Sequence, residues 1–266
     1  MAGDSERINS DVWRSAEVLD IFAHRDGLID EGEALLVQRI AGEAERRPIL
    51  DIGVGGGRTI PYLCSAADEY VAVDYLEEMV DLARASHPGV RVEQGDARDL
   101  SMFADDSFGA VLFSYNGIDG IPHEDRRQVH ASVRRVLRPG GIFGYSTHNI
   151  DYCVAGRPPW ARAQWDVNNG LRAMASCAWR LPERSRSYRR LRKLTVRGDG
   201  WALLVGAGYD FSVLWHHVNF DEARRELDEA GFASDVDVFD ASAAPVQAGQ
   251  DTSDSPWLYL IARKPG

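Results

Sequence analysis

The sequence predicts an α/β fold: a Rossmann-like, doubly wound and mostly parallel sheet of seven strands, the last of them antiparallel. Between residues 48 and 148, short apolar runs alternate with stretches of helical period, which is the pattern of βαβ units. A glycine-rich turn follows the first run, and Pro139-Gly140-Gly141 ends a helix and leads into a strand. N-terminal helices and a helical cap insertion after residue 148 complete the predicted architecture.

The individual elements follow from the period of the apolar residues. Short apolar runs predict strands, and apolar residues three or four positions apart predict helices. Strands are expected at 49–52, 71–74, 90–93, 110–114, 141–146, 234–239 and 257–262, and residues 211–218 form one more apolar run of this kind. Helices are expected at 11–44, 59–67, 76–85, 124–137 and 221–230. Residues 241–256 are small, polar and rich in turn formers, so we expect a mobile loop there.

Composition and charge exclude several classes of protein. The chain has 266 residues, 44% of them hydrophobic, which indicates a globular protein. A formal net charge of −11 argues against nucleic acid or an anionic membrane as a partner. No apolar signal-peptide core is present, and the uncharged apolar stretch 108–118 is too short to span a bilayer. The three cysteines are widely separated and match no disulfide or zinc pattern, so we expect a cytoplasmic monomer or homodimer.

The glycine-rich turn after the strand at 49–52 is the most informative segment. Its acid and glycines have the spacing Asp51-x-Gly53-x-Gly55-x-Gly57, and a helix follows. Glycines without a Cβ let a ligand lie against the backbone, and a helix N-terminus offers free N–H groups. Such a turn commonly binds the pyrophosphate of a dinucleotide. An anionic Asp51 would repel a pyrophosphate, however, and would attract a cation such as an α-ammonium group.

Carboxylates follow three successive strands of the predicted sheet. Asp51 lies at the end of the first strand, Asp74 ends the second, and Asp96 follows the third. Ligands bind at this carboxyl edge of parallel sheets, where an acid after the second strand can accept both ribose hydroxyls. Asp96 could accept the exocyclic amine of adenine. An amine, a ribose and an adenine in this order describe S-adenosylmethionine better than they describe NAD.

Taken together, these motifs resemble those of the class I S-adenosylmethionine-dependent methyltransferases. The matching segments are Asp51 to Gly57 (the first motif), Asp74 (the ribose acid), Asp96-Ala97 (the adenine contact), Asp106 to Val111 (similar to DxSFDxV) and Val136 to Gly141 (similar to LRPGG). The likeness covers about residues 48–148 and 211–264. Val54 departs from the Cys or Ala of many members, and Gly109 stands where Asp is usual.

The resemblance implies a cofactor, S-adenosylmethionine, and a role for each matching residue. Asp51, Gly53 and Gly55 would hold the methionine portion, and Ser114 would offer its carbonyl to the ammonium group. Asp74 would bind the ribose, and Asp96 and Ala97 would contact the adenine edge. Tyr75 would pack either on the adenine or elsewhere in the core. The implied reaction is an in-line transfer of the methyl group to a nitrogen, oxygen or carbon of a small-molecule acceptor.

Residues beyond the predicted fourth and fifth strands are the candidates for contact with the acceptor. His148 is the first candidate base, followed by Tyr115 and by one of the pair His216 and His217. Adjacent residues of a strand point to opposite faces, so only one of that pair should face the site. All four could instead be polar lining. No metal is expected, because adjacent histidines lack the i, i+4 spacing of a metal motif and no carboxylate cluster completes a site.

Three parts of the chain receive separate expectations. Residues 1–47 are expected to form a helical lid, 48–148 with 211–266 the cofactor-binding core, and 149–210 a helical cap that binds the acceptor. The cap's tryptophans could line an apolar acceptor pocket or form the cap's own core, and they are Trp160, Trp165, Trp179 and Trp201. The arginine-rich run 180–197 could bind an anionic acceptor or be a solvated helix face.

Two other functions remain compatible with this sequence. The same sheet could serve an NAD-dependent oxidoreductase, or the chain could be a relative that binds S-adenosylmethionine without donating its methyl group. Nucleic acid is a poor acceptor, because Ser114-Tyr115-Asn116-Gly117 differs from the Asp/Asn-Pro-Pro-aromatic sequence that resembles amino-methylating DNA and RNA enzymes.

Overall fold

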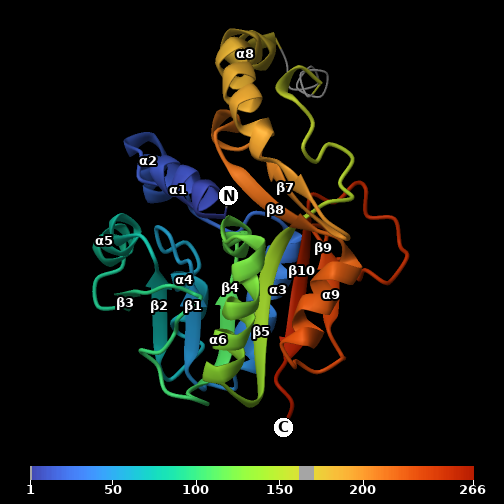
Figure 1. The fold of residues 1–266 in the computed structure, drawn as a ribbon. Helices are drawn as coiled ribbons and strands as arrows, with labels where there is room; N and C mark the ends of the chain where they lie inside the picture. Colours follow the sequence, from blue (N-terminus) through green and yellow to red (C-terminus); the bar gives the residue numbers. More distant parts are fainter. Residues whose placement is uncertain (1, 162–170) are drawn as a thin grey trace.

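A computed structural model describes the backbone of residues 2–161 and 171–266 and the side chains of 3–161 and 179–266 (Figure 1). The strands of this part of the chain join in one sheet. Their bounds are β1 Ile49–Ile52, β2 Tyr70–Asp74, β3 Arg91–Gln94, β4 Phe108–Phe113, β5 Leu137–Asn149, β6 Val196–Arg197, β7 Trp201–Val205, β8 Leu214–Val218, β9 Asp237–Asp240 and β10 Trp257–Arg263.

Seven of these strands form the predicted doubly wound sheet. Strands β3, β2, β1, β4 and β5 lie side by side in this order and are parallel. The last strand, β10, inserts antiparallel between β5 and β9. The strand order reverses beside β1, so ligands are expected outside the carboxyl ends of β1 and β4. The predicted α/β fold with an antiparallel last strand is therefore confirmed.

Three further strands extend this sheet beyond the end of β5. β8 pairs with β5 only at His148–His217 and Asn149–Val218, and it forms an antiparallel ribbon with β7 and β6. The prediction of a helical insertion missed β6 and β7, which lie within it. Their apolar runs are short and follow an arginine-rich helix, so the period of apolar residues did not separate them from it.

Capping side chains mark the beginning of three of the described helices, α2, α3 and α9. Their bounds are α1 Ala2–Trp13, α2 Ala16–Ala23, α3 Glu31–Glu43, α4 Ile60–Leu63, α5 Glu77–Ser86, α6 Arg126–Val136, α8 Leu171–Leu191 and α9 Phe220–Glu229. The helix expected over 11–44 is divided into three. The side chain of Ser15 caps α2 and that of Asp30 caps α3, and Gly27 between them has a φ of 76°. These capping side chains accept backbone N–H groups and so start new helices.

Helices cover both faces of the central sheet (Figure 1). α6 and α9 pack on one face, where Val129, Val133 and Leu227 are fully buried. α3 and α5 pack on the other face through residues such as Leu36 and Ile40. α8 and the β7–β8 ribbon stand above the carboxyl end of the sheet, beside α1 and α2. Among the residues described, no helix combines the length and the apolar character that crossing a membrane requires.

Candidate active site

A cavity of about 1300 Å³ lies at the carboxyl ends of the parallel strands. Most of the residues predicted from the sequence line it, and these are Gly53, Gly55, Asp74, Tyr75, Asp96, Ala97, Ser114, Tyr115, His148 and His217. Asp51 and His216 do not line this cavity. The strand ends therefore bring all of the predicted cofactor residues except Asp51, and two of the predicted histidines, into one space.

The glycine turn has a backbone that only glycine adopts easily. Gly53 and Gly55 have φ values of 66° and 54°, in the left-handed region. A Cβ on Gly55 would lie 2.9 Å from the ring of Phe22, and one on Gly53 would lie 2.7 Å from the ring of Phe113. The turn is thus enclosed between β4 and α2, and it presents bare backbone to the cavity.

Asp74 is a buried carboxylate at the end of β2. Its Oδ2 accepts the N–H of Gly55 and its Oδ1 accepts the N–H of Leu76, each at 3.0 Å. Burial raises the pKa of Asp74 to about 6, although these backbone donors lower it in part. A carboxylate has about four acceptor sites, so Asp74 keeps capacity to accept a hydrogen bond from a ligand hydroxyl group.

Two predicted adenine-side residues, Tyr75 and Asp96, lie next to α1. The hydroxyl of Tyr75 is 2.9 Å from Ser10 Oγ, and its ring meets Trp13 edge to face. Asp96 accepts Arg98 Nη2 at 2.6 Å, and the same guanidinium binds Glu6 of α1. Sequence reasoning did not identify this ion pair, which leaves the Asp96 carboxylate less free than expected.

Asp51 lies in a separate, smaller space behind the glycine turn. Its Oδ2 accepts hydrogen bonds from Thr59 at 2.5 Å and from Tyr70 at 2.7 Å. Burial raises its pKa to about 6 despite these donors. The neighbouring ion pair of Arg58 with the fully buried Glu33 was missed in the sequence, because Glu33 belongs to a helix far from the glycine motif.

The chain turns sharply after β4. Tyr115 and Asn116 both have positive φ values, 55° and 57°, which are uncommon for side chains of this size. The N–H of Asn116 donates to Ser146 Oγ at 2.8 Å and holds this turn against β5. The guanidinium of Arg25 lies 4.5 Å from the centre of the Tyr115 ring and donates to its hydroxyl. Arg25, between α2 and α3, is a cavity residue that the sequence did not indicate.

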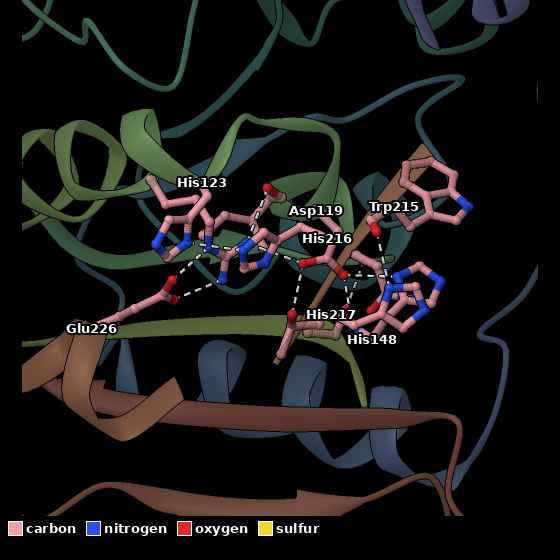
Figure 2. Close-up of polar contacts among 12 residues, drawn as sticks. Asp119, His123, His148, Trp215, His216, His217 and Glu226 are labelled. Carbon is pink, nitrogen blue, oxygen red and sulfur yellow. Dashed lines mark hydrogen bonds and ion pairs between the residues drawn. The ribbon is translucent and has the colours of Figure 1, made fainter. Parts of the chain in front are cut away.

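His148 is paired with a buried carboxylate, Asp119 (Figure 2). Asp119 Oδ2 lies 2.8 Å from Nδ1 of His148 and accepts the His148 backbone N–H at 2.6 Å. Its Oδ1 accepts Thr147 Oγ1 at 2.6 Å and Arg126 at 3.1 Å. This pattern requires Nδ1 to carry the hydrogen, so Nε2 on the other side of the ring is the basic nitrogen. Asp119 lies in the 3₁₀ helix η1 (Gly117–Gly120).

Arg126 connects Asp119 to a second buried acid. Its Nε and Nη2 donate to the two carboxylate oxygens of Glu226 at 2.7 and 2.8 Å. Burial alone would raise the pKa of Glu226, but Arg126 and His130 outweigh it and hold this pKa well below the usual range. Arg126 itself is fully buried. The charges of this group are therefore mutually compensated in the interior.

His216 points away from the cavity, toward His123 (Figure 2). Its Nε2 lies 3.0 Å from Nδ1 of His123, and the two rings are nearly parallel, at 10°, with centres 5.2 Å apart. These values fit two rings that lie edge to edge in one plane, with a hydrogen bond between their facing nitrogens. The pKa of His216 lies well below its usual value because of burial and the charge of Arg126. Of the two adjacent histidines, His217 is the one that lines the cavity, as strand alternation predicts.

His123, His216 and Glu226 also place three potential metal donors within 4.8 Å of one another. Both oxygens of Glu226 accept hydrogen bonds from Arg126. A cation bound there would lie close to the Arg126 charge, which opposes it. The arrangement is better described as a hydrogen-bonded pair of neutral histidines beside an ion pair.

Aromatic side chains surround His148, but they do not come from the cap's tryptophans. Trp13, Trp215 and Trp257 line the cavity, whereas the described cap residues Trp160, Trp179 and Trp201 do not. Trp165 lies outside the described residues. Trp160 packs on Tyr188, Trp179 is exposed, and Trp201 stacks on His123.

The arginine-rich run is partly neutralised by neighbouring acids. Arg180 and Arg184 each pair with Asp210, at 2.9 and 2.8 Å. Arg180 and Arg190 also line the cavity. The run therefore forms a surface helix face that also contributes to the cavity wall, and its binding of an anionic acceptor stays a prediction.

Comparisons with known proteins agree with this site. Residues 49–141 match a family described as a methyltransferase domain. A probable S-adenosylmethionine-dependent methyltransferase of Mycolicibacterium smegmatis is 30% identical over 115 residues, 43% of each chain. A fatty-acid O-methyltransferase of the same organism is 33% identical over 130 residues, 47% of this chain and 44% of that one. The chain thus spans less than half the length of these two relatives.

Comparison with solved structures shows a similar fold. A crystal structure of an S-adenosylmethionine-dependent methyltransferase from Mesorhizobium loti has a TM-score of 0.57 and 20% identity, and covers 87% of this chain and 97% of that one. The fold is the Rossmann-like fold of these structures. The matched domain, the relatives and the fold support a class I methyltransferase that uses S-adenosylmethionine as its cofactor.

Proposed function

We propose that this chain transfers the methyl group of S-adenosylmethionine to a nitrogen, oxygen or carbon of a small-molecule acceptor bound in the cavity. The observation that carries the proposal is a single cavity lined by Gly53, Gly55 and Asp74 together with His148. A relative named as a fatty-acid O-methyltransferase supports a small-molecule acceptor.

The residues present fit the cofactor. Gly53 and Gly55 line the cavity with backbone that carries no side chain, and this surface would accommodate the methionine portion. The buried Asp74 carboxylate lines the cavity at the end of β2, where an acid suits the ribose hydroxyls. Tyr75 and Ala97 would contact the adenine, and Ser114 would offer its carbonyl. When bound, S-adenosylmethionine supplies a methyl carbon on positively charged sulfur, which is transferred to the acceptor's lone pair while the sulfur keeps the electrons of the broken bond.

His148 is the proposed base of the reaction. Its Nδ1 is occupied by Asp119, so Nε2 can take a proton from the acceptor within the cavity. The resulting imidazolium would lie 2.8 Å from the Asp119 carboxylate, which stabilises its charge. Tyr115 and His217 line the same part of the cavity and would position the acceptor.

We also propose that residues 1–47 act as a lid and 149–210 as an acceptor-binding cap. The side chain of Asn9 in α1 exchanges hydrogen bonds with the backbone of Leu214 in β8, at 2.8 and 2.9 Å. Ser10 in the same helix contacts Tyr75 on the cofactor side. The buried residues of α1 at these contacts are polar, so the helix can detach at a smaller hydrophobic cost than an apolar one. Release of α1 would open the cavity.

Calorimetric titration with S-adenosylhomocysteine, the product form of the cofactor, and with NAD tests this proposal. We expect the former to bind one site per chain and NAD to bind none. Binding of NAD without S-adenosylhomocysteine would favour the oxidoreductase alternative. Labelled methyl transfer from S-adenosylmethionine to a panel of small molecules then separates a methyltransferase from a relative that only binds the cofactor, since that relative would label no acceptor.

A further inference from the structure

We propose that the acceptor is a planar ring that carries a hydroxyl group, a phenol or an enol, and that His148 held by Asp119 removes the hydroxyl proton. This inference rests on the proposed methyl transfer and adds the chemical class of the second substrate. Two observations carry it: the orientation of the His148 imidazole and the aromatic side chains that surround it.

The orientation of His148 matters because oxygen and nitrogen acceptors need different help. A neutral amine has a free lone pair and can attack a methyl group before it loses a proton. A neutral hydroxyl is a weak nucleophile, so a base that removes its proton accelerates the attack. Asp119 accepts both the Nδ1–H and the backbone N–H of His148, which fixes one tautomer with a basic Nε2. A base held in one orientation therefore accelerates methylation of a hydroxyl group more than methylation of an amine.

The buried surroundings of Asp119 keep it available for this task. Thr147 and Arg126 occupy its second oxygen, and its side chain is inaccessible to solvent. Arg126 in turn is held by Glu226, so the Asp119 carboxylate faces a fixed positive charge. The Asp119 carboxylate is therefore placed to stabilise an imidazolium at His148.

The cavity walls near His148 are flat and aromatic. Trp215 lies nearly parallel to the His148 ring, at 22° and 5.4 Å between centres. Trp257 meets His148 edge to face at 6.5 Å and meets Tyr115 edge to face at 6.2 Å. All four side chains line the cavity, and they come from separate segments. Such walls favour a flat ring, which can stack on one face and meet the edges of the others.

The cavity also has room for a ring beside the cofactor. Its volume of about 1300 Å³ exceeds the upper end, about 1000 Å³, of sites that hold one drug-sized ligand. Apolar side chains of the β7 strand and of the segment after α8, Val205 and Leu194, line a further part of it. They would accommodate an apolar substituent of the ring.

The proposed step is a balanced proton transfer. The O–H bond of the acceptor breaks, an N–H bond forms at Nε2 of His148, and the electron pair stays on oxygen as the nucleophile. The proton leaves the imidazolium for water after the product departs, which restores the neutral histidine.

The first test follows the ionisation of 4-nitrophenol, whose phenolate absorbs visible light, on protein loaded with S-adenosylhomocysteine. We expect the bound probe to be half-ionised at a pH about one unit lower than the free probe, which is a tenfold change in its ionisation constant. His148→Gln and Asp119→Asn should each remove most of this shift. His24→Gln is a matched control: His24 pairs with Asp20 at 3.3 Å on the surface, outside the cavity, and its loss should leave the shift intact.

The second test compares two acceptors that differ in one atom, 2-naphthol and 2-naphthylamine. We expect the naphthol to be methylated at least tenfold faster, and Asp119→Asn to slow the naphthol alone. An unshifted titration, failure of 4-nitrophenol to bind the loaded protein, or faster methylation of the amine would overturn the inference. Failure of S-adenosylhomocysteine to bind would instead overturn the proposed function, so the two failures are distinguishable.

Discussion

His148 and His216 lie on the paired strands β5 and β8, yet their side chains have opposite surroundings (Figure 2). His148 lies against a carboxylate and lines the cavity, whereas His216 lies against another histidine on the far side and is fully buried. Strand alternation decides which side each ring occupies, and the partner decides its chemistry. A histidine beside an acid can act as a base, while a buried histidine with a depressed pKa stays neutral.

The largest expected effect separates these two histidines directly. His148→Gln should lower turnover by about 10²–10⁴-fold, because it removes the general base, and should leave the affinity for S-adenosylhomocysteine unchanged. His216→Gln should change turnover by less than about threefold, since the ring does not reach the cavity. Steady-state rates with a methylated acceptor and calorimetric affinities measure both. Equal losses in the two variants would contradict the assignment.

The next largest effect concerns Arg126, the buried charge that connects Asp119 beside His148 to Glu226 near His216. Arg126→Met should lower the free energy of unfolding by about 3–5 kcal/mol, because it leaves Asp119 and Glu226 buried without their partner. Arg127→Met is the control, as Arg127 forms an exposed ion pair with Glu229 and should cost less than about 1 kcal/mol. Urea denaturation measures both values. A similar cost in the two variants would show that the buried network is not needed for the fold.

At the cofactor end of the cavity, Asp74→Ala should weaken S-adenosylhomocysteine binding by about 1–3 kcal/mol, or roughly tenfold to a hundredfold, because the ribose hydroxyls would lose their acceptor. Asp99→Ala, which removes an exposed acid outside the cavity, should leave the affinity unchanged. Calorimetry compares the two. Unchanged binding in Asp74→Ala would place the ribose elsewhere.

The smallest effect is a pH dependence of the same affinity. The pKa of Asp74 is about 6 in the folded chain, and the hydroxyls of a ligand bind the ionised carboxylate. Affinity should therefore fall as the pH drops below about 6, by at most about tenfold per pH unit. The raised pKa means that Asp74 binds its proton more tightly in the folded chain than in the unfolded chain, where its pKa is the ordinary 3.8. This proton therefore adds to the free energy of unfolding below about pH 4, and its contribution is lost as the pH rises through 6. Asp74→Asn should flatten both curves, and an unchanged slope would assign them to another group.

The cofactor half of the site could be predicted from the sequence because its residues follow strands in local motifs. Asp74 and Gly55 belong to turns whose positions depend on the adjacent strand, and the sheet then brings them together. The same local pattern predicted that one of His216 and His217 would face the cavity.

The acceptor half depends on contacts between distant segments, which no local pattern shows. Asp119 is one acid in a short glycine-flanked turn, and Arg126 meets Glu226 across 100 residues of sequence. Trp215 and Trp257 were not selected among the seven tryptophans, because the insertion's own tryptophans were the more concentrated group. Their place beside His148 results from the pairing of β5 with both β8 and β10.

A crystal structure of the complex with S-adenosylhomocysteine is the most direct measurement of the central claim, that one cavity joins the cofactor residues to His148. The ribose hydroxyls should bind the Asp74 carboxylate. The sulfur should lie in the cavity that His148 and His217 line. Density for the ligand outside this cavity, or a sulfur that faces His216 and His123, would contradict it.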